Sequence, residues 1–174
     1  MHKDFALLRK YAAGEESYAI VARHGLEVLA KAIEVIRRKQ LYDRVDFELV
    51  VSGCLLHDIG ALGFFDRQDM DGYIRHGILG AEILEREGRE REALIAKRHT
   101  GAGLTREEIA QAGWDLPRED MLPISLEERI VCYADKFSSK RPDAHETIET
   151  IMKEFENYGP EPLARFQALR GEFE

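Results

Sequence analysis

Helix start and stop signals follow one another along almost the whole sequence, and they restrict the chain to a helical fold. Stretches with apolar residues at helical spacing are ended by glycines such as Gly14, Gly60, Gly88 and Gly159. No stretch alternates apolar and polar residues convincingly enough for a half-buried strand, since residues 43–49 are short and lead into an apolar run. The sequence therefore predicts an all-α protein.

Capping residues indicate where the predicted helices begin. Residues 105–108 (Thr-Arg-Glu-Glu) and 125–128 (Ser-Leu-Glu-Glu) have the form of a capping box, in which a hydroxyl and a glutamate each bind a backbone amide. Asp4 and Ser17 are candidate start signals, and Pro142 fits the first turn of a later helix. We expect helices after both capping boxes, after Pro162, and over residues 4–14, 18–38, 45–59, 74–87, 89–98 and 142–159.

Size and charge exclude several classes of protein. The 174 residues include 44% hydrophobic residues, enough for one domain with a buried core. A net charge of −8 argues against non-specific nucleic-acid binding. An apolar run long enough to span a membrane, a secretory signal and a cysteine framework are not seen. We expect a soluble, cytoplasmic single domain over residues 1–174, with a motif core at about 18–142 and C-terminal helices over 142–171.

Histidines and aspartates occur at positions where a buried side chain is expected. His24 has apolar residues one helical turn away, the pair His57-Asp58 ends the apolar run 49–56, and Asp135 follows an apolar helix. A buried carboxylate needs a cation, supplied by Lys, Arg or a metal ion that also binds neutral imidazole. A hydrogen-bonded core histidine is the alternative for each residue taken alone. The candidate ligands are His24, His57, Asp58, His76, His99 and Asp135.

The order of these residues resembles that in a known superfamily. His24, then His57-Asp58, then Asp135 matches the H…HD…D pattern of the HD-domain metal phosphohydrolases, and residues 57–60 spell its HDIG form. Residues 75–84 and 97–101 resemble the segments that carry a fourth and a fifth ligand in the branch that binds two metals. Within the superfamily, residues 18–142 are most similar to the hydrolases that cleave diadenosine tetraphosphate symmetrically.

The resemblance implies a division of the ligands between two metal ions. His24, His57, Asp58 and Asp135 would hold one ion, and Asp58 would bridge to a second ion held by His76 and His99. Asp58 and His57 would be the catalytic pair. Two divalent transition metal ions (Fe, Mn, Ni or Co) would activate water to cleave a phosphoester or phosphoanhydride of a small nucleotide or dinucleotide.

Basic and aromatic residues are candidates for contacts with this substrate. Arg141, Lys140 and Lys97 are the predicted phosphate-binding residues, because guanidinium and ammonium groups pair with phosphate oxygens. Trp114 and the pair at 64–65 (Phe-Phe) could stack on a nucleobase, or could simply cover the core. Cys54 and Cys132, one helical turn before His57 and Asp135, are expected to be small packing residues.

The sequence leaves the substrate and the assembly open. The diadenosine tetraphosphate hydrolases typically carry a lysine soon after the His-Asp pair, residues 59–62 contain none, and the turn at 100–104 also differs. A neighbouring HDIG branch, a nucleoside monophosphate phosphatase, a cyclic-nucleotide phosphodiesterase and a non-catalytic nucleotide-binding HD module are therefore alternatives. The expected partner is a small phosphorylated molecule, not a nucleic acid or a membrane, and a homodimer is one of the open oligomeric states.

Overall fold

The computed structural model describes residues 3–63, 74–139 and 146–174, and it confirms the all-α prediction. Within these residues β-type pairing of the backbone is confined to isolated bridges such as Leu104 with Met121. None of the described helices is both long and apolar enough to cross a membrane. The elements are α1 (Lys3–Tyr11), α2 (Glu15–Arg38), α3 (Phe47–Leu56), a 3₁₀ helix η1 (Ile59–Gly63), α5 (His76–Arg86), α6 (Glu90–Arg98), α7 (Arg106–Ala112), α8 (Leu126–Asp135), α9 (Ile148–Tyr158) and α10 (Pro160–Phe173).

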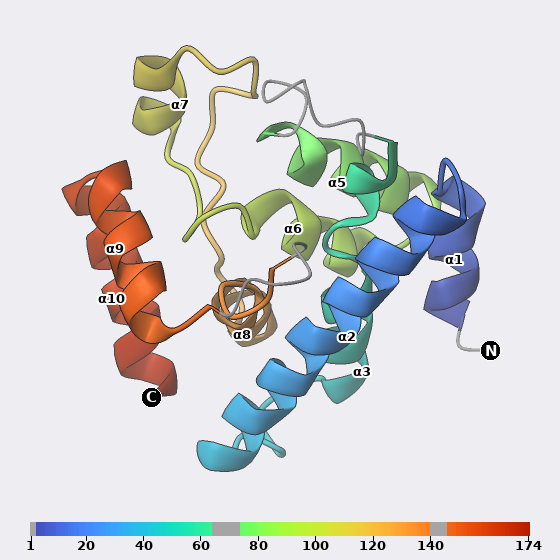
Figure 1. Ribbon diagram of the computed structural model, residues 1–174, viewed down its shortest axis with the longest axis horizontal. Coiled ribbons are helices and arrows are strands. Elements are labelled where there is room, and N and C mark those ends of the chain that lie inside the picture. The colour runs from blue at the N-terminus through green and yellow to red at the C-terminus, as the bar shows by residue number, and fades with distance from the viewer. Residues whose placement is uncertain (1–2, 64–73, 140–145) are drawn as a thin grey trace.

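Helix α8 occupies the centre of the arrangement. It is seen end-on in Figure 1, where α9 and α10 lie side by side at one edge of the molecule and α1 lies at the opposite edge. Helices α2, α3, α6 and α10 all pack against α8, while η1 and α6 pack against α5. Segments far apart in the sequence therefore meet around the C-terminal end of α8.

The buried apolar residues form two large clusters that share α2 and α3. One cluster takes Val28 and Ile36 from α2 and packs them against α8, α9 and α10. The other takes Val21 from α2 and packs it against α1, η1, α5 and α6. His24 lies between the two sets of α2 residues, and is itself buried. The polar site described below is therefore enclosed by apolar packing, where each charge needs a partner.

Two glycines allow the elements around His24 and Asp58 to pack closely. A Cβ atom on Gly60 would collide with the carbonyl oxygen of His76 and the amide nitrogen of Gly80. A Cβ atom on Gly25 would lie 3.0 Å from the carbonyl oxygen of Cys54. The backbone of η1 thus lies directly against α5, and α2 lies directly against α3.

One of the two predicted capping boxes is formed, and the other is formed only in part. At Thr105 the box is confirmed, because its hydroxyl accepts from the amide of Glu108 while the Glu108 carboxylate accepts from the amide of Thr105. At Ser125 the hydroxyl does accept from the amide of Glu128. The Glu128 carboxylate, however, accepts from the amide of Ile124 instead. The prediction of a reciprocal box was therefore wrong in this detail.

Several helix boundaries differ from the sequence-based expectation, because other residues act as caps. Helix α3 begins at Phe47 and not at residue 45, since the Asp46 carboxylate accepts from the amide of Leu49. Helix α9 begins at Ile148, because Thr147 is its cap. Pro142 lies outside the described residues. Helix α10 begins at Pro160 and extends to Phe173, beyond the expected end near residue 171.

The first two helices also differ at their starts. Asp4 does not cap α1, since it lies within the helix, fully buried, where Arg89 donates to its carboxylate at 3.1 Å. Ser17 is the third residue of α2, and its hydroxyl binds back to the backbone of Gly14. The partner of Asp4 is thus distant in the sequence, whereas Ser17 takes part in a local cap three residues after Gly14.

Candidate metal centre

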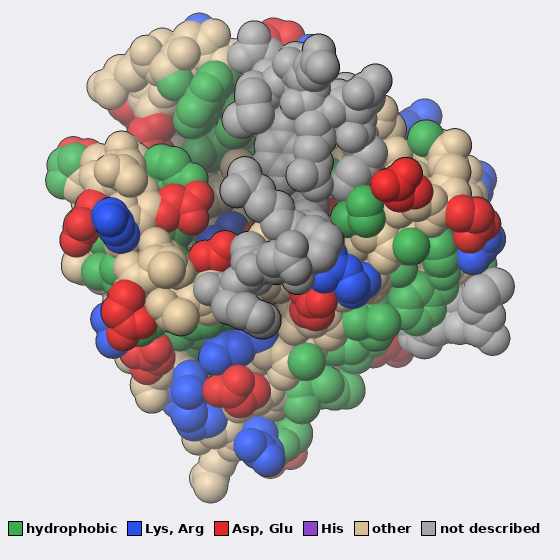
Figure 2. Space-filling view, in the orientation of Figure 1, with side chains coloured by type: hydrophobic (Ala, Val, Ile, Leu, Met, Phe, Trp, Pro, Cys, Tyr) green, Lys and Arg blue, Asp and Glu red, His purple; other side chains and the backbone are tan. Residues whose placement is uncertain are grey.

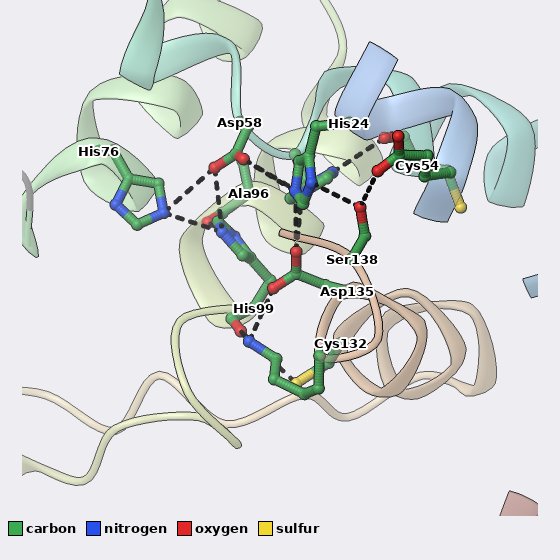
Figure 3. A network of polar contacts seen from close by, with 12 residues as sticks. His24, Cys54, Asp58, His76, Ala96, His99, Cys132, Asp135 and Ser138 are labelled. Carbon is green, nitrogen blue, oxygen red and sulfur yellow. Dashed lines mark hydrogen bonds and ion pairs between the residues drawn. The ribbon is translucent and has the colours of Figure 1, made fainter. Parts of the chain in front are cut away.

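The predicted ligands come from separate elements and converge on one buried point (Figure 3). Side-chain exposure ranges from 0% for His57 to 13% for Asp135. Their positions are the middle of α2 (His24), the residue after α3 (His57), the link between α3 and η1 (Asp58), the first residue of α5 (His76), the residue after α6 (His99) and the last residue of α8 (Asp135).

One group of ligand atoms surrounds the imidazole of His24. Its Nε2 lies 2.9 Å from Oδ1 of Asp135, 3.2 Å from Oδ2 of Asp58 and 3.2 Å from Nε2 of His57. The Nε2 of His57 lies 3.3 Å from the same Asp135 oxygen and 3.5 Å from the same Asp58 oxygen. These four side chains therefore present two nitrogens and two oxygens to one small volume.

A second group lies on the other side of Asp58. The Nε2 atoms of His76 and His99 lie 2.9 Å apart. They are 3.3 Å and 3.5 Å, respectively, from Oδ1 of Asp58. The two oxygens of one carboxylate thus face different pairs of histidines, Oδ2 towards His24 and His57 and Oδ1 towards His76 and His99.

These spacings match those of atoms bound to one metal ion. Ligand atoms at ~2.1 Å from a metal lie ~3.0 Å apart at right angles and ~3.4 Å apart at the tetrahedral angle. Three groups of residues offer ligand atoms within 4.8 Å of one another: His24–His57–Asp58, His57–His99–Asp135 and Asp58–His76–His99. Within the described residues, the geometry therefore fits metal binding at this place.

Backbone carbonyls determine which nitrogen of two histidines carries the proton. The Nδ1 of His57 lies 2.9 Å from the carbonyl oxygen of Cys54, and the Nδ1 of His99 lies 2.7 Å from that of Ala96. A carbonyl can only accept, so each Nδ1 donates and, in the neutral ring, each Nε2 keeps a lone pair. Lone pairs and carboxylate oxygens that face one another repel unless a cation lies between them, so the donor set fits a metal ion.

His24 also has a hydrogen-bond partner on the ring nitrogen that faces away from the centre of the site. Its Nδ1 lies 3.0 Å from the hydroxyl oxygen of Ser138, in the segment after α8. That hydroxyl donates in turn to Oε2 of Glu27 on α2, at 2.6 Å. Arg23 pairs with the other oxygen of Glu27 at 3.1 Å. A polar chain thus connects the centre of the site to the surface.

The electrostatics of the metal-free protein reflect this crowding. Burial lowers the pKa of His24, but its hydrogen bonds to Asp135 and Asp58 outweigh burial and raise the pKa to about 9. Burial lowers the pKa of His99 below its ordinary value. Burial raises the pKa of Asp135, yet Lys136 and the two neighbouring histidines outweigh it and hold the pKa well below the ordinary value. The site therefore favours an ionised Asp135 and draws positive charge towards His24.

Basic residues near the centre are already paired in the structure. Lys136 donates to the carbonyl oxygen of His99 at 3.2 Å, and its ammonium lies 2.7 Å from Oδ2 of Asp135. Lys97, a predicted phosphate-binding residue, pairs with Glu119 at 2.8 Å. A phosphate group at Lys97 would therefore compete with Glu119 for the ammonium.

The remaining residues predicted near the substrate either lie outside the described residues or pack in or against the core. Lys140, Arg141 and the phenylalanine pair at 64–65 lie outside the described residues. Trp114 is half-buried and packs on an apolar cluster that includes Ile109 and Met121, which agrees with a core-covering role. Cys54 and Cys132 are buried free thiols, and burial raises the pKa of both, that of Cys132 to about 11.

Sequence reasoning missed the outer contacts of the site. His57 and His99 each follow the last residue of a helix and each bind the carbonyl three residues earlier, a pattern that the sequence spacing alone could have suggested. The contact between Ser138 and His24 spans 114 residues, so no local pattern could have revealed it.

Fold and site together define a helical domain with a candidate metal centre at the junction of its helices. The chain belongs to the HD domain family, whose profile matches residues 21–140.

Two solved structures share the fold. The HD domain of the L. monocytogenes phosphodiesterase PgpH matches with a TM-score of 0.58 over 99% of this chain and 88% of that chain, at 18% identity. A second structure of that domain, in complex with cyclic-di-AMP, also matches with a TM-score of 0.58 at 18% identity, over 99% of this chain and 87% of that one. At this identity the likeness establishes the fold.

Sequence relatives include one protein of similar size and two larger ones. An uncharacterized protein of Methanocaldococcus jannaschii is 46% identical over 140 residues, which cover 78% of this chain and 75% of that protein. A tRNA (cytidine(56)-2'-O)-methyltransferase of Picrophilus torridus is 40% identical over 113 residues, or 64% of this chain and 30% of the enzyme. The enzyme of the same name in Thermoplasma volcanium is 35% identical over 150 residues, or 84% of this chain and 39% of the enzyme.

Proposed function

We propose that the chain is a two-metal phosphohydrolase that cleaves a phosphoester or phosphoanhydride bond of a small nucleotide or dinucleotide. The observation that carries the proposal is the division of the Asp58 carboxylate. One oxygen faces His24 and His57 while the other faces His76 and His99, at 3.2–3.5 Å in each case. A carboxylate placed in this way can be shared by two cations.

The residues have distinct roles in this proposal. His24, His57, Asp58 and Asp135 would hold one divalent ion, and Asp58, His76 and His99 the other, with Fe, Mn, Ni or Co as the expected metals. When bound, the ions supply a Lewis acid for a phosphoryl oxygen and lower the pKa of water.

The chain itself supplies preorganisation. The carbonyls of Cys54 and Ala96 hold the rings of His57 and His99 with Nε2 towards the centre. Apolar packing around the site lowers the local dielectric constant, which strengthens the electrostatic interactions inside it.

Because the chain carries a net charge of −8, an anionic substrate must be attracted by positively charged groups close to the site itself. On the face drawn in Figure 2, Lys and Arg side chains are interspersed with Asp and Glu. Lys97 is the described candidate for a phosphate contact, and Arg141 and Lys140 stay predictions. Family membership favours phosphate ester chemistry. The cyclic-di-AMP complex of the PgpH domain supports a nucleotide as the substrate class.

A second candidate substrate is a phosphate ester at an end of an RNA chain. Two relatives that contain a matching stretch are named as tRNA methyltransferases, and in both it makes up under two fifths of the protein. This stretch could act on a phosphate group linked to RNA. The acidic charge of the present chain favours a free nucleotide over intact RNA as its substrate.

A substrate screen with metal analysis tests the proposal. Protein purified without chelator is assayed for metal content and for phosphate or nucleotide release. The substrates are diadenosine tetraphosphate, nucleoside monophosphates, cyclic nucleotides, cyclic dinucleotides and RNA with terminal phosphates. We expect about two equivalents of metal and turnover of at least one small nucleotide. A protein that binds neither Mn, Fe, Co nor Ni would contradict the proposal, and turnover of RNA alone would favour the second candidate.

A further inference from the structure

Ser138 contacts a candidate ligand although it lies outside the ligand set. Its hydroxyl oxygen is 3.0 Å from Nδ1 of His24 (Figure 3). It is also 2.6 Å from Oε2 of Glu27. The two contacts join the segment after α8 to α2, 111 residues earlier in the sequence. Ser138 is thus placed between a metal-facing ring and a surface carboxylate.

The protons of this chain can be assigned from its chemistry. An ionised carboxylate only accepts, so the hydroxyl proton of Ser138 is directed to Glu27. A serine hydroxyl has one proton, and its oxygen must therefore accept from the other neighbour. Nδ1 of His24 is then the donor, and in a neutral ring the lone pair lies on Nε2. This is the nitrogen that lies 2.9 Å from Oδ1 of Asp135 and 3.2 Å from Oδ2 of Asp58.

We propose that Ser138 is a positioning residue which, through its hydrogen bond to Glu27, holds His24 in the tautomer that can bind the first metal ion. The inference rests on the proposed metal centre and extends it to a pair of outer residues. His57 and His99 are fixed by backbone carbonyls. His24 lies inside a helix, and its outer contact is a side chain. The first site therefore depends on a side-chain contact that mutation can remove.

Glu27 is held in place for this role. Arg23, one turn earlier on α2, donates to Oε1 of Glu27 at 3.1 Å, which leaves Oε2 for Ser138. The Glu27 side chain is 42% exposed, so its replacement does not open a cavity. Glu34, on the same helix, is 44% exposed and pairs with Lys31 and Arg38. Glu34 is therefore a matched control for Glu27.

Titration with Co²⁺, followed by visible absorption and chelator competition, tests the role of Ser138. Loss of an outer partner typically weakens metal binding 10–100-fold, and we expect a loss of about that size for one equivalent in Ser138→Ala while the other is unchanged. Ser138→Thr restores the hydroxyl and should recover the affinity. Glu27→Gln should weaken the same equivalent by a smaller factor, because an amide can either accept or donate. Glu34→Gln should leave both affinities unchanged.

Long-range ¹H–¹⁵N correlation spectra of the Zn²⁺-loaded protein supply a second readout. The wild type should show His24 protonated on Nδ1, and Ser138→Ala and Glu27→Gln should show this assignment weakened. Equal Co²⁺ affinity and an equal His24 signature in both variants would overturn the inference. If Ser138→Ala fails to fold by circular dichroism, the exposed Glu27→Gln decides the question. Wild-type protein that binds no Co²⁺ would instead contradict the proposed metal centre itself.

Discussion

His24 and Asp135 lie 111 residues apart in the sequence, yet Nε2 of one is 2.9 Å from Oδ1 of the other. The contact exists because α2 and α8 pack together through a shared apolar cluster, in which Val28 of α2 and Val131 of α8 are fully buried. Core packing therefore sets the distance between two candidate ligands. The site is coupled in this way to the stability of the fold.

Asp58→Asn should remove the group that both proposed metal ions share. The amide keeps the volume of the side chain but not its charge, so His76 and His99 lose the carboxylate they face, and His24 and His57 keep Asp135 alone. We expect metal content to fall by at least one equivalent and turnover to fall more than the 10–100-fold typical of an outer partner. Metal analysis and single-turnover assays measure both effects. Asp115→Asn, which changes a carboxylate that is 89% exposed, is the control. Wild-type metal content in Asp58→Asn would contradict the bridging role.

His76→Ala and His99→Ala should each empty the second proposed site and leave the first. The four side chains around His24 are unchanged in both variants. Turnover should fall steeply, because one ion cannot stabilise both the entering and the leaving oxygen. Metal stoichiometry and turnover are measured, with circular dichroism as the control for folding. Two ions and full turnover in both variants would show that these are ordinary buried histidines.

The chemical character of single residues, judged against their neighbours in the sequence, indicated which side chains belong to the site. An aspartate that follows an apolar run, such as Asp58 or Asp135, needs a buried partner, and this requirement can be read from the sequence. The helices themselves were predictable, because their apolar spacing and capping residues are local. The family was likewise indicated by the order of the residues.

Contacts between distant segments could not be predicted from the sequence. The division of the Asp58 oxygens depends on how η1 lies against α5, and that depends on tertiary packing. Glu27 on α2 and Ser138 after α8 are ordinary polar residues in local terms. The pairing of Lys97 with Glu119 likewise joins a helix to a segment 22 residues away, and only the fold places them together.

Gly60→Ala should disturb the site without changing a ligand. The new Cβ would collide with backbone atoms of His76 and Gly80, so η1 and α5 must move apart. We expect a loss of about 1–3 kcal/mol in the free energy of unfolding and weaker binding of the second metal ion. Urea denaturation and metal titration measure these changes. Gly63→Ala, in the same 3₁₀ helix, meets no atom of the described residues within 4 Å and serves as the control. Equal effects of the two substitutions would contradict the packing argument.

Lys97 and Glu119 should affect substrate binding in opposite directions. If Lys97 binds a phosphate, Lys97→Gln should raise KM about tenfold, which corresponds to ~1.4 kcal/mol. Glu119→Gln removes the competing carboxylate, 2.8 Å from the ammonium, and should lower KM. Steady-state kinetics on the substrate found in the screen measure both. Unchanged KM in both variants would remove Lys97 from the proposed phosphate contacts.

The ion pair between Glu108 and Arg165 should make stability depend on pH. Arg165 on α10 donates to both oxygens of Glu108, at 2.7 Å and 2.8 Å, and to the carbonyl oxygen of Gly103 at 3.1 Å. Burial raises the pKa of Glu108, but the hydrogen bond from Arg165 outweighs burial and holds the pKa below its ordinary value of 4.5. A lowered pKa in the folded state means that the stabilisation is present above the ordinary value and is lost as the pH falls through the lowered one.

Glu108→Gln should therefore destabilise the metal-free protein at pH 7 by about 1–2 kcal/mol, and the difference from wild type should shrink as the pH falls below about 4.5. Urea denaturation at a series of pH values measures it. Glu107→Gln is the control, because that neighbouring side chain is 65% exposed and an exposed ion pair contributes little.

The ion pair between Glu108 and Arg165 also holds the turn that follows His99, since Arg165 binds the carbonyl oxygen of Gly103 as well. Loss of the pair should for this reason weaken metal binding at His99 slightly, by less than a direct partner would. A difference between Glu108→Gln and wild type that stays constant from about pH 7 to about pH 3 would show that the ionised carboxylate is not what stabilises the contact.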